Sequence, residues 1–285
     1  MKANFSIVIP ARNEAAALGV LLPELRRLHP HSDLIVVNDG SSDDTAGVAE
    51  HCGARVISLP HGMGNGAAIK AGARAAAADT IVFMDGDGQH APGDVQRLLA
   101  ALEGGYVMAV GARNSASQAS VFRLLANRFY NTLASWITGQ RIADLTSGFR
   151  AARTESFREF LHLLPNGFSY PTTITMAFLR AGYPVHYVPI TAAARVGKSH
   201  IRPLQDGLRF ALIIFRIGTL YSPLKIFFPI GASMFLLGIG NYIYTYIVSA
   251  RFTIMSAMLL LAALFVFLIG LVSEQITALI YQRRS

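Results

Sequence analysis

Short apolar runs recur along the first 190 residues, and most of them are rich in β-branched side chains. The runs are FSIVIP from Phe5, DLIVVND from Asp33, ARVISL from Ala54, TIVFMD from Thr80, YVMAVGA from Tyr106 and YPVHYVPI from Tyr183. Apolar residues follow one another within them without strict alternation, which predicts strands that are buried on both faces of a sheet.

Segments with helical spacing of their apolar residues separate these runs. They are EAAALGVLLPELRRL from Glu14, GAAIKAGARAAAA from Gly66, GDVQRLLAAL from Gly93, VFRLLANRFYNTLASWI from Val121 and PTTITMAFLRAG from Pro171. Strands that alternate with helices predict an α/β fold with a mainly parallel, Rossmann-like sheet. Ligands of such sheets collect at the carboxyl ends of the strands, where PARNE, NDGSSDD and DGDGQH all fall.

The pattern changes after residue 190. AARVGKSHIRP, residues 193–203, has no apolar periodicity and predicts a mobile basic loop. Residues 203–224 are strongly apolar but carry Arg209 and Arg216 seven positions apart, on one stripe of a helix. We expect an amphipathic juxtamembrane helix here, with a core helix that exposes two arginines as the alternative.

The last sixty residues contain two apolar segments without charge, from Ile226 to Ala250 and from Phe252 to Val272. Each exceeds the roughly 20 residues needed to cross a bilayer core. They predict two transmembrane helices, at 226–250 and 252–273, joined by a short turn; two buried helices of a soluble bundle are the alternative. The expected organisation is therefore a domain at 1–202, the helix at 203–224 and the hairpin with a short basic tail at 225–285.

Charge predicts how the hairpin is oriented. Lys225, Arg283 and Arg284 flank it on one side, against Arg251 alone at the turn, which favours cytoplasmic flanks. The N-terminal apolar run is too short for the core of a secretory signal, and a single cysteine, Cys52, fits a reducing compartment. We expect a multi-pass protein of the inner (cytoplasmic) membrane whose N-terminal domain lies in the cytoplasm.

A net charge of +8 over 285 residues is compatible with nucleic acid, anionic lipid or a phosphorylated substrate as partner. The motif DGDGQ favours the last of these. Asp85 and Asp87 follow a buried strand, and the flanking glycines let a ligand approach closely. Paired carboxylates of this kind predict a site for Mg²⁺ or Mn²⁺, which would neutralise the charge of a departing diphosphate. An isolated D-x-D is also common in turns.

Two further motifs follow other strands. In IPARNEA, the residues Pro10, Arg12 and Glu14 leave the first strand where a nucleotide could lie, although Glu14 also stands at a helix start. In VVNDGSSDDT, Asp39 ends a strand and could accept hydrogen bonds from a ribose or base. We interpret residues 41–44 of the same motif as a helix cap.

The ordered set FSIVIPARNEA, VVNDGSSDDT, GNGAAIKAG, FMDGDGQHAP, DLTSGFRA and RVGKSHI resembles the family 2 glycosyltransferases with the GT-A fold. The resemblance covers residues 5–202 and points to the branch of dolichyl-phosphate mannosyltransferases and bacterial polyprenyl-phosphate glycosyltransferases. Some members of that branch have two C-terminal spans. Many relatives also carry an acidic residue near Pro171 or Thr172, which this chain lacks, so their sugar specificity is not carried over.

The resemblance implies roles for individual residues. Metal ligands would be Asp85, Asp87 and Gln89, and the nucleotide-sugar pocket would comprise Pro10, Arg12, Glu14, Asp39 and Asp85. The catalytic set would be Asp87, Arg113, Arg123, Arg195 and Lys198. Within it, Arg113 would reach the donor phosphates, and Arg195 and Lys198 would close over the diphosphate. Arg123 with Asn127 would hold the lipid phosphate.

The expected reaction is an inverting, metal-dependent transfer of one sugar from a nucleotide diphosphate to a polyprenyl phosphate, undecaprenyl or dolichyl. UDP is the favoured nucleotide, with GDP or dTDP as alternatives, and nucleic acid is not an expected partner. A lipid phosphate is already anionic at neutral pH, because its second pKa is about 6, so the reaction requires cations more than a base. A non-catalytic nucleotide-sugar-binding scaffold, a different membrane acceptor and a homo-oligomer remain open. HGMGNG does not meet G-x-G-x-x-G, which argues against a dinucleotide-binding loop.

Overall fold

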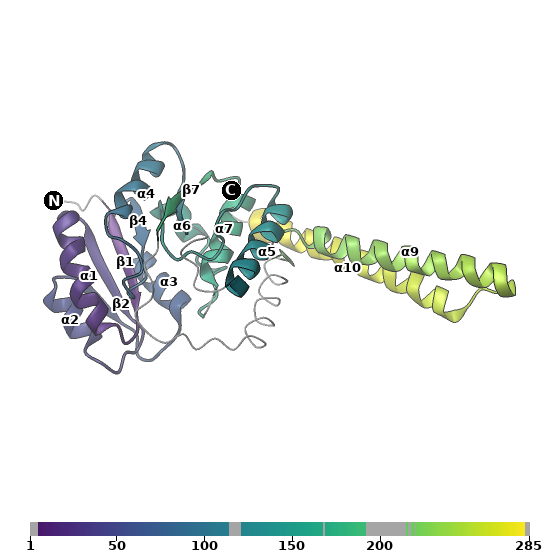
Figure 1. The fold of residues 1–285 in the computed structure, drawn as a ribbon, viewed down its shortest axis with the longest axis horizontal. Coiled ribbons are helices and arrows are strands. Elements are labelled where there is room, and N and C mark those ends of the chain that lie inside the picture. Colours follow the sequence, from purple (N-terminus) through teal and green to yellow (C-terminus); the bar gives the residue numbers. More distant parts are fainter. Residues whose placement is uncertain are drawn as a thin grey trace. The chain divides into compact units, whose positions relative to one another are not determined.

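A computed structural model describes residues 5–113, 121–167, 169–191, 215, 218–219 and 221–282 of the chain. The chain divides into two compact units, Met1–Ile201 and Arg202–Ser285. The first is an α/β domain and the second contains a helical hairpin, and each is described by itself (Figure 1).

Seven strands form one sheet in the first unit. They are β1 (Ser6–Ala11), β2 (Asp33–Asn38), β3 (Arg55–Ser58), β4 (Thr80–Phe83), β5 (Met108–Arg113), β6 (Arg150–Arg153) and β7 (Val185–Ile190). Their order is β3-β2-β1-β4-β6-β5-β7, and all neighbours are parallel except β6, which runs antiparallel to both β4 and β5. The six apolar runs are confirmed as strands. The sequence RAAR did not predict β6, because it has neither β-branched residues nor an apolar run.

The helices of this unit are α1 (Ala15–Leu28), α2 (Thr45–His51), α3 (Asn65–Ala75), α4 (Asp94–Glu103), α5 (Val121–Thr138), α6 (Thr154–Glu159) and α7 (Tyr170–Arg180). On one face of the sheet, α1, α2 and α4 bury their apolar side chains against Ile7, Ile9 and Leu34. On the other face, Gly72 of α3 lies against Val8, and Phe157 of α6 packs on Phe83 with ring centroids 4.4 Å apart. Both faces are covered, as the apolar strands predict.

In the second unit, α9 (Pro223–Ser249) and α10 (Ile254–Gln282) pack along each other as an antiparallel pair (Figure 1). Both are long and apolar enough to cross a membrane. Large apolar side chains point outward from this pair; Leu236, Ile247 and Ile254 are 69, 78 and 80 % exposed. Such a surface is unsuited to water. The helices begin and end within a few residues of the expected spans, apart from α10, which continues to Gln282.

Close approach and polar contacts hold the two helices together. A Cβ added to Gly231 would lie 3.2 Å from the Ala263 carbonyl oxygen, so a small residue lets the backbones approach. Asn241 Nδ2 donates to Ser256 Oγ at 2.9 Å. At the other end, the Glu274 carboxylate accepts hydrogen bonds from Ser222 Oγ and the Leu224 N–H, both at 3.2 Å, and so caps the start of α9.

Candidate active site

Asp85 and Asp87 follow the fully buried strand β4, which fixes their backbone at the edge of the sheet. Both residues are half-buried. The Asp85 carboxylate lies against Gly148, where an added Cβ would be 2.8 Å from Oδ2. Burial raises the pKa of Asp85, and the Asp87 charge raises it further, against the opposing effect of His90 and Arg113. A cation between the two carboxylates would relieve this repulsion.

Gln89 and His90 complete the motif. Gln89 Nε2 donates to Asp87 Oδ2 at 2.9 Å, and its backbone N–H donates to Asp87 Oδ1 at 3.2 Å. Gln89 thus orients Asp87, and its role as a metal ligand stays a prediction. His90 is buried and stacks on Phe149 at a centroid distance of 4.9 Å, which anchors the end of the loop.

The loops after β1 and β2 are locked together. The Asp43 carboxylate accepts hydrogen bonds from the N–H groups of Ala15 and Thr45, the first residues of α1 and α2. One side chain therefore serves the starts of two helices, and the interpretation of residues 41–44 as a cap is confirmed. Glu14 occupies the N-cap position of α1 without a side-chain cap hydrogen bond. Glu14 therefore stands at the helix start, as the alternative for this residue expects, and its contact with a nucleotide stays a prediction.

Asp39 has a structural role that the sequence did not predict. It is 5 % exposed, and its carboxylate accepts hydrogen bonds from the N–H groups of Met63 at 2.6 Å and Gly64 at 2.9 Å. These bonds fold the HGMG segment back over the end of β2. The Arg12 guanidinium lies on the same segment, because a Cβ added to Gly62 would meet Arg12 Nη1 at 2.6 Å. Arg12 and Asp39 therefore border one loop, with Pro10 half-buried in β1 nearby in the chain.

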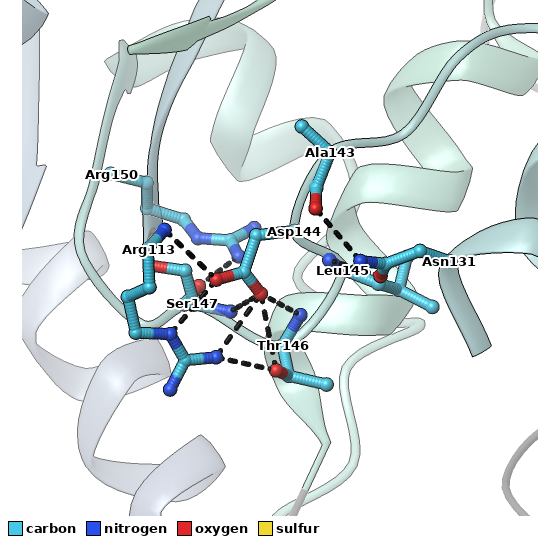
Figure 2. Close-up of polar contacts among 8 residues, drawn as sticks. All are labelled: Arg113, Asn131, Ala143, Asp144, Leu145, Thr146, Ser147 and Arg150. Atoms are coloured by element: carbon cyan, nitrogen blue, oxygen red, sulfur yellow. Dashed lines mark hydrogen bonds and ion pairs between the residues drawn. The ribbon is translucent and has the colours of Figure 1, made fainter. Parts of the chain in front are cut away.

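Arg113, at the end of β5, is bound to Asp144 through two parallel contacts (Figure 2). Its Nε lies 2.8 Å from Asp144 Oδ2, and its Nη2 lies 3.1 Å from Oδ1 and 2.7 Å from Thr146 Oγ1. Bidentate pairing fixes the plane of the guanidinium. Nη1 has no hydrogen-bond partner among the described residues, so one edge of Arg113 remains for an anionic ligand.

The Asp144 carboxylate is saturated. Besides the Arg113 side chain it accepts hydrogen bonds from the N–H groups of Arg113, Thr146 and Ser147 and from Thr146 Oγ1. Burial alone would raise its pKa, but the hydrogen bond and charge of Arg113 hold the pKa of Asp144 below its ordinary value. It is suited to holding Arg113 and unsuited to accepting a proton. Sequence reasoning gave this residue no role, although the Asp, Thr, Ser and Gly residues of DLTSG are typical of a turn.

Arg150 fixes the other end of the same loop. It is fully buried in β6, and its guanidinium donates to the carbonyls of Ser147 and Pro171 and to Thr175 Oγ1. It also lies 5.6 Å above the ring of Tyr170, whose hydroxyl donates to the Gly148 carbonyl. The start of α7 is thereby tied to the loop that presses on Asp85.

Four predicted site residues and one helix fall outside what is described. Arg123 and Asn127 lie on α5 at positions whose side chains are not described, and Arg195 and Lys198 lie outside the described residues. The amphipathic helix expected at 203–224 is described only at residues 215, 218–219 and 221–224. Their predicted roles stay predictions.

The residues of the DGDGQ loop fit a divalent metal of the hard class. No group of three or more His, Cys, Asp or Glu side chains that could hold a metal occurs in the described part of the chain. Mg²⁺ commonly uses one or two protein carboxylates and completes its sphere with substrate phosphates and water. Asp85 and Asp87 provide that minimal set.

Comparison with known proteins supplies the family. The model for Glycosyl transferase family 2 matches residues 6–161, and the model for the GtrB C-terminal hairpin matches residues 222–279. The chain is 28 % identical over 244 residues to Glycosyltransferase AglJ of Haloferax volcanii, covering 84 % of this chain and 80 % of AglJ. It is 29 % identical over 204 residues to Polyprenol monophosphomannose synthase of Mycolicibacterium smegmatis, covering 66 % of this chain and 77 % of the relative.

Among solved structures, the chain resembles glucosyl-3-phosphoglycerate synthase from Mycobacterium tuberculosis in complex with Mn²⁺, UDP-glucose and phosphoglyceric acid. The TM-score is 0.60 and the identity 25 %, over 76 % of this chain and 80 % of that one. The predicted family and fold class are confirmed. The chain with its carboxylate pair after β4 and its apolar hairpin belongs to glycosyltransferase family 2.

Proposed function

We propose that the protein transfers one hexose or hexose-derived sugar from a nucleotide diphosphate to a polyprenyl phosphate at the cytoplasmic face of the inner membrane. The observation that carries this proposal is the joining, in one family 2 chain, of the Asp85–Asp87 pair to a hairpin of the GtrB type. The relative named Polyprenol monophosphomannose synthase supports a lipid acceptor. The resulting lipid-linked sugar would serve as a donor for cell-envelope modification.

The donor site is the rim around the DGDGQ loop. Asp85 and Asp87 would hold Mg²⁺ or Mn²⁺, and the ion would supply positive charge that offsets the charge of the departing diphosphate. The free edge of Arg113 would bind the same diphosphate. Arg12 and the loop held by Asp39 would border the nucleoside, with UDP favoured because a UDP-glucose complex is known for the similar synthase.

The reaction needs no general base. An oxygen of the acceptor phosphate, already anionic, attacks the anomeric carbon, and the bond from that carbon to the diphosphate oxygen breaks with inversion. No proton has to move. This agrees with Asp144, whose oxygens are occupied by donors and whose pKa is lowered. Catalysis then rests on bringing two anionic substrates together with cations and holding them in line.

A direct test uses the purified full-length chain with undecaprenyl phosphate, Mn²⁺ or Mg²⁺ and a panel of labelled UDP, GDP and dTDP sugars. We expect one donor to give a labelled lipid that is extractable into organic solvent. Phosphoglycerate and other membrane acceptors are offered in parallel, because the similar synthase binds a soluble phosphorylated acid. Label in the soluble acceptor alone, or binding of donor without transfer to anything, would contradict the proposal.

A further inference from the structure

Asn131 of α5 uses both ends of its side-chain amide to hold the residues on either side of Asp144. Its Nδ2 donates to the Ala143 carbonyl at 2.7 Å, and its Oδ1 accepts a hydrogen bond from the Leu145 N–H at 3.0 Å (Figure 2). One turn further along α5, Ser135 Oγ accepts from the Ile142 N–H at 3.0 Å. The backbone just before and after Asp144 is therefore fastened to α5.

This fastening reaches Arg113 through Asp144. The carboxylate between the two anchored residues fixes the guanidinium through the contacts at 2.8 and 3.1 Å. Asp144 itself is buried, with its side chain 7 % exposed, so the carboxylate is held by its protein partners and its place follows that of the loop. A displacement of the loop would move Arg113 with it.

The position of Asn131 along α5 links this support to the acceptor. Positions 123, 127, 131 and 135 are spaced by four residues and follow one stripe of the helix. The first two are those predicted to hold the acceptor phosphate, and the last two fasten the loop of Asp144. One rigid helix therefore spans both sets of positions.

We propose that Asn131 is a positioning residue, which sets the place of Arg113 on the donor diphosphate relative to the acceptor positions on α5. The inference rests on the proposed function for the identity of the acceptor, whereas its effect on Arg113 does not depend on the acceptor. Alignment of two substrates is sensitive to small displacements; an error of about 1 Å can cost about 100-fold in rate.

The test is a double-mutant cycle between Asn131 and Arg113 in the full-length protein. Dissociation constants are measured by calorimetry with Mn²⁺ and whichever of UDP, GDP and dTDP the wild type binds most tightly. Arg113→Ala removes a charged hydrogen bond and should weaken binding about 10-fold or more. Asn131→Ala should weaken it several-fold, and Asn131→Asp should do the same because an aspartate cannot donate to the Ala143 carbonyl.

The decisive result is the double variant. If Asn131 acts through Arg113, then Asn131→Ala should change binding by less than about 2-fold once Arg113 is alanine. Thr132→Ala is the control, because the exposed Thr132 hydroxyl donates only within its own helix, to the Arg128 carbonyl. Independent, multiplying effects of the two substitutions would overturn the proposal, as would wild-type binding by Asn131→Ala.

Transfer assays separate this inference from the proposed function. We expect Asn131→Ala to lower kcat on the order of 10- to 100-fold. A non-additive binding cycle in a protein that transfers nothing to undecaprenyl phosphate would support the role of Asn131 and contradict the proposed function. Normal transfer to undecaprenyl phosphate together with an additive binding cycle would support the proposed function and contradict the role of Asn131.

Discussion

The DGDGQ and DLTSG loops each place aspartate at the site but in opposite electrostatic states. Asp85 faces another carboxylate, and burial raises its pKa. Asp144 is also buried, yet it already holds a guanidinium and several N–H groups, so its pKa is lowered. Burial alone therefore does not decide what an aspartate does. The DGDGQ loop, where two carboxylates repel each other, is the one proposed to take a metal, whereas the DLTSG loop binds the guanidinium of Arg113 through Asp144 and positions it.

The largest expected effect comes from removing Asp87, one of the two carboxylates of the DGDGQ loop. Asp87→Ala should lower transfer by about 1,000-fold or more, because metal stabilisation of a leaving diphosphate is worth several kcal/mol. Circular dichroism should show the fold retained, and Mn²⁺ binding should be lost by electron paramagnetic resonance. Near-normal turnover of Asp87→Ala would contradict the assignment of metal binding to the DGDGQ loop.

Charge removal should have opposite effects on stability in the two loops. Asp144→Asn leaves Arg113 without its ionic partner, and breaking a buried pair costs about 3–5 kcal/mol of unfolding free energy. Asp85→Asn removes repulsion from Asp87 and should leave the metal-free protein as stable as the wild type or more stable. Thermal unfolding with EDTA measures both. A loss of stability in Asp85→Asn equal to that in Asp144→Asn would contradict the comparison.

The pH dependence of these differences should also have opposite signs. Because the pKa of Asp144 is lowered on folding, its contribution is complete above the unfolded value of about 4 and disappears as the pH falls through the folded value. Because the pKa of Asp85 is raised, the advantage of Asp85→Asn should grow as the pH rises above about 4. Denaturant unfolding between acidic and neutral pH, without metal, tests both signs.

A substitution at Gly148, in the DLTSG loop, should change metal binding by the DGDGQ loop. Gly148→Ala would place a methyl group 2.8 Å from Asp85 Oδ2, so the carboxylate must turn away while the fold is kept. We expect Mn²⁺ affinity to fall by about 10-fold, equivalent to about 1.4 kcal/mol. Gly93→Ala, where no atom lies within 4 Å of the added group, should bind Mn²⁺ as the wild type does.

The smallest expected effect is on stability and concerns a third carboxylate, that of Glu274 in the hairpin. Glu274 caps the start of α9, and Glu274→Gln should reduce stability in detergent by about 1 kcal/mol because the amide oxygen still accepts hydrogen bonds. Glu274→Leu should cost more. Unfolding temperatures of both variants measure this, and equal values for the two would show that capping is not the role of Glu274.

Local signals sufficed for the strands that carry the metal carboxylates. A strand buried on both faces, such as β4, is mostly apolar, so TIVFMDGD indicates both the strand and the residues at its end. The helical spacing of apolar residues likewise predicts the helices. One example is α4, which lies within one residue of its expected position. The sequence RAAR of β6 has no such apolar pattern, and the hydrogen-bond partners that allow Arg150 to be buried come from α7 and the preceding loop.

The sequence by itself determined the α/β order, the carboxylate pair after β4 and the two long apolar segments, since each depends on neighbours in the chain. Tertiary structure decided that Asp39 holds the Met63–Gly64 backbone, that Asp144 holds Arg113 across 31 residues and that Asn131 holds the loop of Asp144. The physical reason is that a polar side chain takes whichever buried donor or acceptor the fold brings within about 3 Å, and the distance along the chain does not specify that partner.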